Sequence, residues 1–348
     1  MTTSGSTSAL MNLTADDFML LANPYRRELL AHCYRMLGSV HDAEDLVLET
    51  YRRAWRAYAR FDGHSSLRTW LHAIATTACL SALDDRDHRS MPTALGGPAD
   101  DPTADLVARP ELPWLEPLPD TLAGLDETDP TVVVAPRESV QLELVAALQQ
   151  LPARQRAVLI LRDVLHWPVA DVADALDMTA AAVNSAAQRA RGQLDRVAPR
   201  PDVTVEPARD DQDALLARWA DMFRDGDFDR VAGLVTDDVV CELPPFAQWV
   251  VGPDAVRRLI NAQFPARRPG DLLLRRTRAN GTPAFATYLR DEATGGYRAY
   301  HVQVLTLAPA GVRHLAIFFD TSLFAAFGLP TTAGRPDDLS SLPGDGSY

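Results

Sequence analysis

The sequence predicts a multi-domain protein in which two all-α segments precede an α+β domain. Three observations support this fold class. The chain has 348 residues, which is more than one small core usually needs. Two stretches with apolar residues at helical spacing are separated by a long segment rich in proline and acidic residues. In the last third of the chain, helical patterns give way to strand-like runs separated by turns.

The formal net charge of -13 is unevenly distributed along the chain. Residues 84–138 hold thirteen acidic residues against four arginines, whereas residues 150–200 hold seven arginines against five aspartates. Because most of the acidity lies in one internal segment, the average charge does not exclude nucleic-acid binding by the other parts.

Composition excludes several classes of protein. No apolar run approaches the roughly 18–20 residues of a membrane helix, and MTTSGSTSALMNLTADD lacks the basic and apolar parts of a signal peptide. Cys33, Cys79 and Cys241 are far apart and lack ligand-pair spacing, which argues against a disulfide framework or a zinc site. We therefore expect a cytoplasmic protein that has no contact with the membrane and needs neither a metal nor a cofactor.

The first helical segment covers residues 20–90. It follows a Ser/Thr-rich N-terminus, residues 1–19, that we expect to be disordered. Leu29, Leu30, Cys33, Met36 and Leu37 recur at three- and four-residue spacing, which is typical of a buried helix face. Ser65-Ser66 offers an N-cap to the last helix of this segment.

Residues 91–138 form an acidic, proline-rich linker, because nine prolines interrupt any regular element there. Within it, PWLEPLP (113–119) carries enough apolar surface to dock on another part of the chain.

The second helical segment, residues 139–197, ends in the pattern of a helix-turn-helix. Pro168 to Leu176 forms a short helix, Asp177-Met178-Thr179 a turn, and Ala180–Leu194 the second helix. Its outer face carries amide, hydroxyl and arginine side chains, which are the types that contact base edges and phosphates. These are Asn184, Ser185, Gln188, Arg189 and Arg191. On spacing alone, a helical hairpin with a solvated face remains an equal alternative to DNA binding.

Residues 210–330 read as an α+β domain and residues 331–348 as a flexible tail. One or two helices come first, followed by the runs VVCEL, LLLRRTRA, PAFATYLRD, YRAYHVQVLTLA and VRHLAIFF. Alternation along YRAYHVQVLTL places His301 and Gln303 on the same face of one strand.

Most of the chain resembles one family. HDAEDLVLETYRRAWRAYARFDGHSSLRTWLHAIATTACLSAL (41–83) resembles region 2 of the bacterial extracytoplasmic-function sigma factors, and LPARQRAVLILRDVLHWPVADVADALDMTAAAVNSAAQRARGQL (151–194) resembles region 4. PYRRELLAHCYRMLGS (24–39), WLEPLPD (114–120) and LFAAFGLP (323–330) are similar to the subgroup with a C-terminal SnoaL-like domain. That domain has the cone-shaped fold shared with nuclear transport factor 2.

The resemblance implies partners and sites. Core RNA polymerase would be bound through its β′ clamp helices and its β flap, and promoter DNA through the −10 and −35 elements. The acidic residues expected to contact polymerase are Asp42, Glu44, Asp45 and Glu49. Residues expected near a flipped −10 base are Ser65, Ser66, Arg68 and Trp70, and the five outer residues of the second helix would contact the −35 element.

One string departs from the family pattern. Relatives commonly end region 2 with arginines that follow the promoter backbone, whereas this chain has LDDRDHRS, with Asp84, Asp85 and Asp87. Acidic side chains repel phosphate and weaken such binding. The substitution fits a sigma factor with a restricted promoter set, and it also fits a chain that has lost promoter binding.

The cone would enclose a pocket between its sheet and helices. Its candidate residues for acid–base chemistry or ligand binding are His301, Glu242, Asp320, Tyr288, Trp249 and Gln303. A histidine near a carboxylate can transfer protons close to neutral pH. The alternatives are a pocket that only packs and one that binds a small molecule without converting it.

The leading function is therefore a sigma factor that directs core polymerase to specific promoters and is regulated in cis by its cone domain. The alternative is a sigma-like scaffold that serves as a cyclase, isomerase or hydratase acting on a small hydrophobic metabolite.

Overall fold

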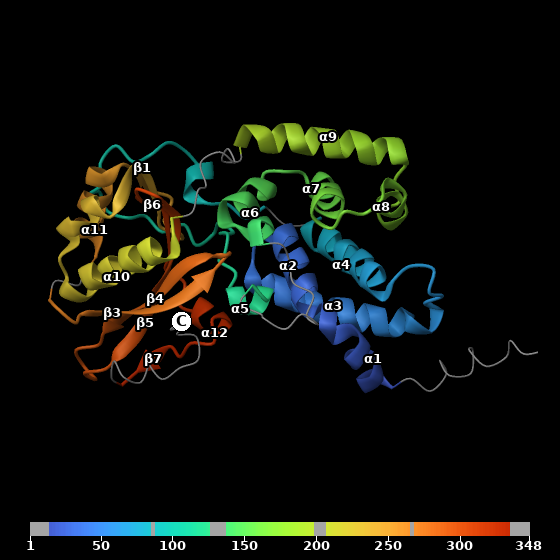
Figure 1. Cartoon of the computed structure of the whole chain (residues 1–348), viewed down its shortest axis with the longest axis horizontal. Coiled ribbons are helices and arrows are strands. Elements are labelled where there is room, and N and C mark those ends of the chain that lie inside the picture. Colours follow the sequence, from blue (N-terminus) through green and yellow to red (C-terminus); the bar gives the residue numbers. More distant parts are fainter. Residues whose placement is uncertain (1–13, 85–87, 126–136, 198–206, 265–267, 335–348) are drawn as a thin grey trace, which may run out of the picture. The chain divides into compact units, whose positions relative to one another are not determined.

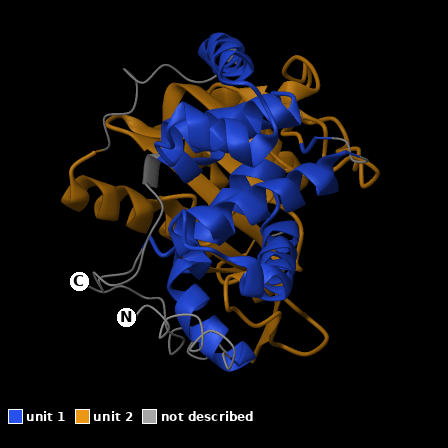
Figure 2. Cartoon of the chain, turned by 90° about the vertical axis from the view of Figure 1, so that its right-hand side faces the viewer, with its two compact units in different colours: residues 1–89, 120–198 blue, residues 90–119, 199–348 orange. Residues whose placement is uncertain are grey.

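The computed structural model describes residues 14–84, 88–125, 137–197, 207–264 and 268–334. The chain divides into two compact units (Figure 2). The first comprises residues 1–89 and 120–198, and the second residues 90–119 and 199–348.

The first helical segment consists of four helices whose ends are set by capping residues (Figure 1). They are α1 (Ala15–Ala22), α2 (Arg26–Leu37), α3 (Val40–Ala57) and α4 (Leu67–Leu83). Gly38, with φ 71°, ends α2, and the Ser39 side chain caps α3. Ser66 caps α4 as the sequence predicted. Helices α2, α3 and α4 pack against one another around a core that includes Leu29, Cys33 and Cys79.

The second helical segment belongs to the same compact unit and packs against the first. Its elements are α6 (Leu142–Gln149), α7 (Ala153–Leu159), a π-helical turn (Ile160–Val164), α8 (Val169–Leu176) and α9 (Ala180–Val197). Helix α4 contacts both α7 and α8, and a short helix, α5 (Asp120–Ala123), contacts α2.

The second unit is a curved sheet with helices packed against it (Figure 1). Its strands are β1 (Val235–Glu242), β2 (Trp249–Val251), β3 (Leu272–Ala279), β4 (Thr282–Arg290), β5 (Tyr297–Ala308), β6 (Gly311–Phe318) and β7 (Thr332–Ala333). The strand order is β2-β1-β6-β5-β4-β3, with β7 beside β5. Strands β1 and β6 pair in parallel, and the other strand pairs in the described part of the chain are antiparallel.

Helices α10 (Arg209–Asp225), α11 (Pro253–Gln263) and α12 (Leu323–Ala326) also belong to this C-terminal domain. Helix α10 contacts β3, and α11 contacts β1 and β2. Apolar side chains from α10, α11 and the sheet, such as Trp219, Ile260 and Leu305, form one continuous core. This arrangement is the α+β domain that the sequence predicted.

Residues 90–119, which we call the strap, are the first part of the predicted linker. They fold with the second unit and contain little regular structure besides a 3-10 turn at Pro92–Ala94. The strap is connected at Arg89 and Asp120 to residues of the first unit.

Two predicted boundaries need correction. Helix α1 begins at Ala15, inside the N-terminus expected to be disordered, because Thr14 and Asp17 form a capping box. The tail expected from residue 331 starts with β7, whose residues Thr332 and Ala333 pair with Arg298 and Tyr297. The rest of the N-terminal prediction, the tail beyond residue 334 and Asp85 and Asp87 lie outside the described residues.

Among the described residues, none of the helices combines the length and the apolar character needed to cross a bilayer.

Candidate functional site

Helix α3 carries the acidic residues predicted to contact a protein partner, and they differ in availability. Asp42 pairs with Arg89 at 2.8 Å, and Glu44 lies 3.5 Å from Arg26. Glu49 accepts a hydrogen bond of 2.9 Å from Arg53, which lowers the pKa of its carboxyl group. Asp45 is exposed.

Two large apolar residues accompany Asp45 on the surface of α3. Leu48 is 47% exposed and Trp55 is 38% exposed. Residues 45, 48 and 55 follow one another at three and seven positions, which places them along one side of a helix. An exposed mixture of a carboxylate with a leucine and a tryptophan is typical of a protein-binding surface.

The loop before α4 contains an aromatic cluster. Phe61 and Trp70 have ring centroids 4.9 Å apart, and Tyr58 lies 5.9 Å from Phe61. All three side chains are partly exposed. Rings presented in this way can stack on unpaired bases. Ser65 is exposed, while the Ser66 hydroxyl is used to cap α4 through the backbone N–H of Thr69.

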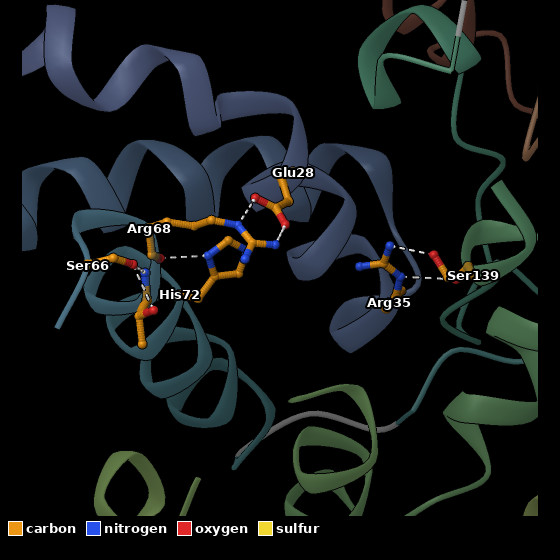
Figure 3. Close-up of polar contacts among 7 residues, drawn as sticks. Glu28, Arg35, Ser66, Arg68, His72 and Ser139 are labelled. Atoms are coloured by element: carbon orange, nitrogen blue, oxygen red, sulfur yellow. Dashed lines mark hydrogen bonds and ion pairs between the residues drawn. The ribbon is translucent and has the colours of Figure 1, made fainter. Parts of the chain in front are cut away.

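Arg68 is directed inward by a buried partner. Its guanidinium donates two hydrogen bonds to the carboxylate of Glu28, one of them 2.8 Å from Nε to Oε2. Figure 3 shows Arg68 bonded to Glu28. Glu28 is buried, and Arg68 remains 39% exposed. The backbone carbonyl of Arg68 is in turn bonded to Nδ1 of His72 at 2.8 Å. The pair fixes the start of α4 relative to α2, so Arg68 has a structural role beside the predicted DNA contact.

Two buried arginines join the first helical segment to the second. Arg35 in α2 donates to the backbone carbonyl of Ser139 (3.0 Å) and to its hydroxyl (2.6 Å), as Figure 3 shows. Arg156 in α7 donates to the carbonyl of Met36 and to the side chain of Gln149. Burial lowers the pKa of each guanidinium to about 10.

These buried polar residues were not predicted from the sequence. The available signal was Arg35 itself, which lies inside the apolar stripe of LLAHCYRML. Arginine is seldom fully buried unless it is paired, so its position on a core face indicates a specific acceptor. That acceptor is Ser139, which lies more than one hundred residues away along the chain. Its identity could not be deduced from the sequence.

The helix-turn-helix is present in α8 and α9. Asp177 ends α8 with φ 50°, and the Thr179 hydroxyl accepts from the backbone N–H of Ala182 at the start of α9. Val172, Leu176 and Val183 are buried between the helices. The predicted outer residues Asn184, Ser185, Gln188, Arg189 and Arg191 are all exposed.

Arg191 already has a partner within the unit. Its guanidinium forms two hydrogen bonds with the Asp163 carboxylate, at 2.8 and 2.5 Å, which raises its pKa. A phosphate would have to compete with this carboxylate for Arg191, whereas the exposed Arg189 lies on the same helix one half-turn away.

His301 lies in a closed polar network inside the C-terminal domain. Its Nε2 is 2.9 Å from Nε2 of Gln303, which also donates to Thr287. Gln303 accepts a 2.9 Å bond from the indole N–H of Trp219. Aromatic rings of Phe264, Tyr300 and Phe319 surround His301. His301 is fully buried, and this burial lowers its pKa to about 3.

The other residues predicted to join His301 in a pocket lie elsewhere. Glu242 contacts His314 (2.8 Å) and the backbone N–H of Thr93 (2.7 Å). The Trp249 indole donates to the Gly96 carbonyl, the Tyr288 hydroxyl to the Pro330 carbonyl, and Asp320 accepts from Ser322. The expected convergence is therefore wrong, because the strand register places Tyr288 and Thr287 on opposite faces and the strap engages Glu242 and Trp249.

A neutral, enclosed imidazole without a neighbouring carboxylate in this network is poorly suited to proton transfer near pH 7. The described geometry of His301 and Gln303 is that of an interior polar network in which Nε2 of His301 is bonded to Gln303 and its buried Nδ1 has no hydrogen-bond partner among the described residues.

Comparisons with known proteins match three family models. Sigma-70 region 2 matches residues 21–89, Sigma-70 region 4 matches residues 141–194, and a SnoaL-like domain matches residues 216–311. The chain is 51% identical over 315 residues to a Mycobacterium tuberculosis protein called ECF RNA polymerase sigma factor SigG, which covers 90% of this chain and 84% of that protein.

A second M. tuberculosis protein, ECF RNA polymerase sigma factor SigJ, is 28% identical over 256 residues, which cover 70% of this chain and 72% of that protein. The crystal structure of SigJ superposes with a TM-score of 0.56 at 24% identity, over 91% of this chain and 100% of the other. This structural likeness supports the order of the folds: helical segments first, the α+β domain last.

Proposed function

The chain belongs to the extracytoplasmic-function family of RNA polymerase sigma factors, and we propose that its exposed surfaces divide the recognition of polymerase and promoter as follows. Directing core RNA polymerase to promoters is the activity of this chain, and core polymerase and promoter DNA are its partners. A partner of core polymerase works in the cytoplasm, and we place the chain there.

Polymerase docks on α3 of region 2. The surface of Asp45, Leu48 and Trp55 supports this assignment, since it combines an exposed carboxylate with exposed apolar area. Basic residues of the β′ clamp helices would pair with Asp45 and compete with the arginines now beside Asp42, Glu44 and Glu49. Region 4 is the part proposed to meet the β flap.

The −10 element binds at the loop before α4. The cluster of Tyr58, Phe61 and Trp70 offers stacking surfaces for a base that has left the duplex, with Ser65 and Ser66 beside it. Arg68 would hold the start of α4 in place through its hydrogen bonds to Glu28, and contact with phosphate would be a secondary role.

The −35 element binds along α9. Asn184, Ser185, Gln188 and Arg189 present hydrogen-bonding groups suited to base edges, and Arg191 can contact phosphate by leaving Asp163. The exposure of these side chains at the start and middle of the second helix of a helix-turn-helix is the observation that supports this assignment best.

The SnoaL-like domain regulates the sigma regions in cis, and it does so without catalysis. The buried, neutral His301 and the dispersal of the other candidate residues support a non-catalytic domain. A small-molecule ligand remains part of this proposal. A small pocket formed by strap residues such as Leu106 and domain residues such as Gln248, Trp249 and Leu259 supports the seam between them as its place.

The variant Arg189→Ala tests the region 4 assignment. We expect holoenzyme formed with this variant to bind promoter DNA about tenfold more weakly, with a salt dependence reduced by about one charge, because one cation near phosphate and base edges is lost. An electrophoretic mobility shift titration at several salt concentrations measures both effects.

Arg196→Ala is the matched control, because Arg196 is exposed on the same helix but bonds back to the Gly192 carbonyl. Equal affinities of the two variants, with wild-type salt dependence, would remove Arg189 from the promoter interface.

A further inference from the structure

The strap is attached to the SnoaL-like domain along most of its length. Backbone bonds join Ala99 N–H to the Trp249 carbonyl (2.8 Å) and Arg109 N–H to the Pro245 carbonyl (2.8 Å). The Trp249 indole donates to the Gly96 carbonyl at 3.0 Å. Ala99 and Leu106 also pack against the core of the domain.

Side chains of the domain add further contacts between these points. Gln248 accepts from Val107 N–H (3.2 Å) and donates to the Asp105 carbonyl (3.1 Å). Gln263 donates to the Ala104 carbonyl (2.8 Å), and Arg258 pairs with Asp101 (3.2 Å). The domain thus binds the strap mainly through backbone N–H and C=O groups of the strap. These groups are available because the proline-rich strap forms no strands of its own.

The two ends of the strap are joined to each other. Ser90 N–H donates to the Pro113 carbonyl and Leu115 N–H to the Ser90 carbonyl, both at 3.0 Å. Ser90 and Trp114 therefore form a short parallel bridge that closes a loop over the intervening residues. At the far end, Leu118 and Asn280 exchange two hydrogen bonds, at 2.8 and 2.9 Å.

Closing this loop shortens the connection between regions 2 and 4. Fully extended, the chain from Ser90 to Leu142 could span about 170 Å, whereas the chain from Leu115 to Leu142 could span only about 90 Å. The positions −35 and −10 are about 25 base pairs apart, which corresponds to about 85 Å along B-DNA. With the loop closed the connection can reach that far only when pulled straight.

We propose that the SnoaL-like domain regulates this sigma factor by storing linker length: it binds the strap, keeps the Ser90–Trp114 loop closed, and so limits how far regions 2 and 4 can separate on a promoter. This proposal rests on the proposed function, because it needs both regions to bind DNA at once. When the strap is released from the domain, the loop opens and the connection between regions 2 and 4 becomes longer. The binding partner of this domain surface is the chain's own linker.

A reversible lock on the loop tests the proposal. The double variant Ser90→Cys/Trp114→Cys places two cysteines on bridge partners, and the three native cysteines are buried. Run-off transcription with core polymerase is measured for the oxidised and the reduced protein, on promoters whose spacer is lengthened or shortened one base pair at a time.

We expect the oxidised lock to bind core polymerase like wild type, to transcribe at least tenfold less than its reduced form, and to lose the longest spacers first. Damage to the fold would instead lower transcription from promoters of every spacer length to the same extent. Equal transcription and equal spacer preference of oxidised and reduced protein would overturn the proposal. Absence of transcription by the wild-type chain itself would instead overturn the proposed function.

A loosened strap provides a second, polymerase-independent test. The triple variant Gln248→Ala/Arg258→Ala/Gln263→Ala removes domain contacts to the strap but no core side chain. We expect faster amide hydrogen exchange at Ala99, Val107 and Arg109. The double variant Arg257→Ala/Asn261→Ala on α11 is the control, because both side chains bond to Asp229 and Arg257 also pairs with Asp254. Unchanged exchange in the triple variant would show that these contacts do not hold the strap and would overturn the proposal.

Discussion

Histidines buried in a neutral form are the side chains through which pH acts on this fold. His32, His72 and His301 are almost fully buried. Desolvation lowers the pKa of all three. At His32, the neighbouring His72 and Arg35 lower the pKa further, whereas at His72 the Glu28 carboxylate opposes the effect of desolvation. His301 reaches about 3.

We therefore predict that acidification destabilises the folded chain. A folded pKa below the unfolded value of about 6.5 means that only the unfolded chain takes up the proton between the two values. Stability is thus complete above pH 6.5 and falls below it by about 1.4 kcal/mol per pH unit for each such histidine. Urea unfolding of the SnoaL-like domain within the full chain, between pH 7.5 and 5, measures the slope.

His301→Gln is expected to reduce that slope, whatever it does to stability at neutral pH. A slope that persists in full in His301→Gln would show that the protonation of His301 is not what the folded domain resists.

At the scale of single residues, the sequence could predict which side chains lie on the surface of a helix, but not which residues they bond to. Exposure of Asn184 and Arg189 follows from helical periodicity alone. The pairing of Arg68 with Glu28, of Arg191 with Asp163 and of Arg35 with Ser139 depends on how the helices pack. Such contacts between distant positions have no signature in local spacing.

Among the elements, α3 presents the surface whose role is simplest to isolate. We predict that Asp45→Arg/Leu48→Ala weakens binding to core polymerase by at least tenfold, because a carboxylate and an exposed apolar contact are lost and a like charge faces basic residues. Affinity is measured with immobilised core enzyme.

Arg52→Ala, also exposed on α3, serves as the control. Binding of the double variant at wild-type strength, with unchanged helix content, would move the polymerase contact away from this face of α3.

Elements with strong local signals could be predicted well. Capping at Ser66, the turn at Asp177–Thr179 and the alternating strands of the C-terminal domain all come from short-range rules. The strap could not be assigned to the SnoaL-like domain, because its contacts are mostly backbone hydrogen bonds, which any sequence of suitable shape can make. The predicted convergence of Glu242, Trp249 and Tyr288 on His301 was wrong for a different reason, because it depended on the strand register and on contacts with the strap.

On the scale of the whole molecule, each compact unit is built from two stretches that are not adjacent in the sequence. The strap lies between regions 2 and 4 in sequence but folds with the domain that follows them. Removing the SnoaL-like domain at Pro201 would therefore also leave the strap without its binding surface. Effects of such a truncation on transcription combine the loss of the domain with the release of the linker.

The measurement that tests the central claim most directly is run-off transcription by core RNA polymerase with the intact chain on a promoter library. We predict specific transcripts from templates that share a −35 and a −10 element at a restricted spacing, and fewer of them with Arg189→Ala because that variant binds promoter DNA about tenfold more weakly. Stable binding to core polymerase without any template-specific transcript would contradict it.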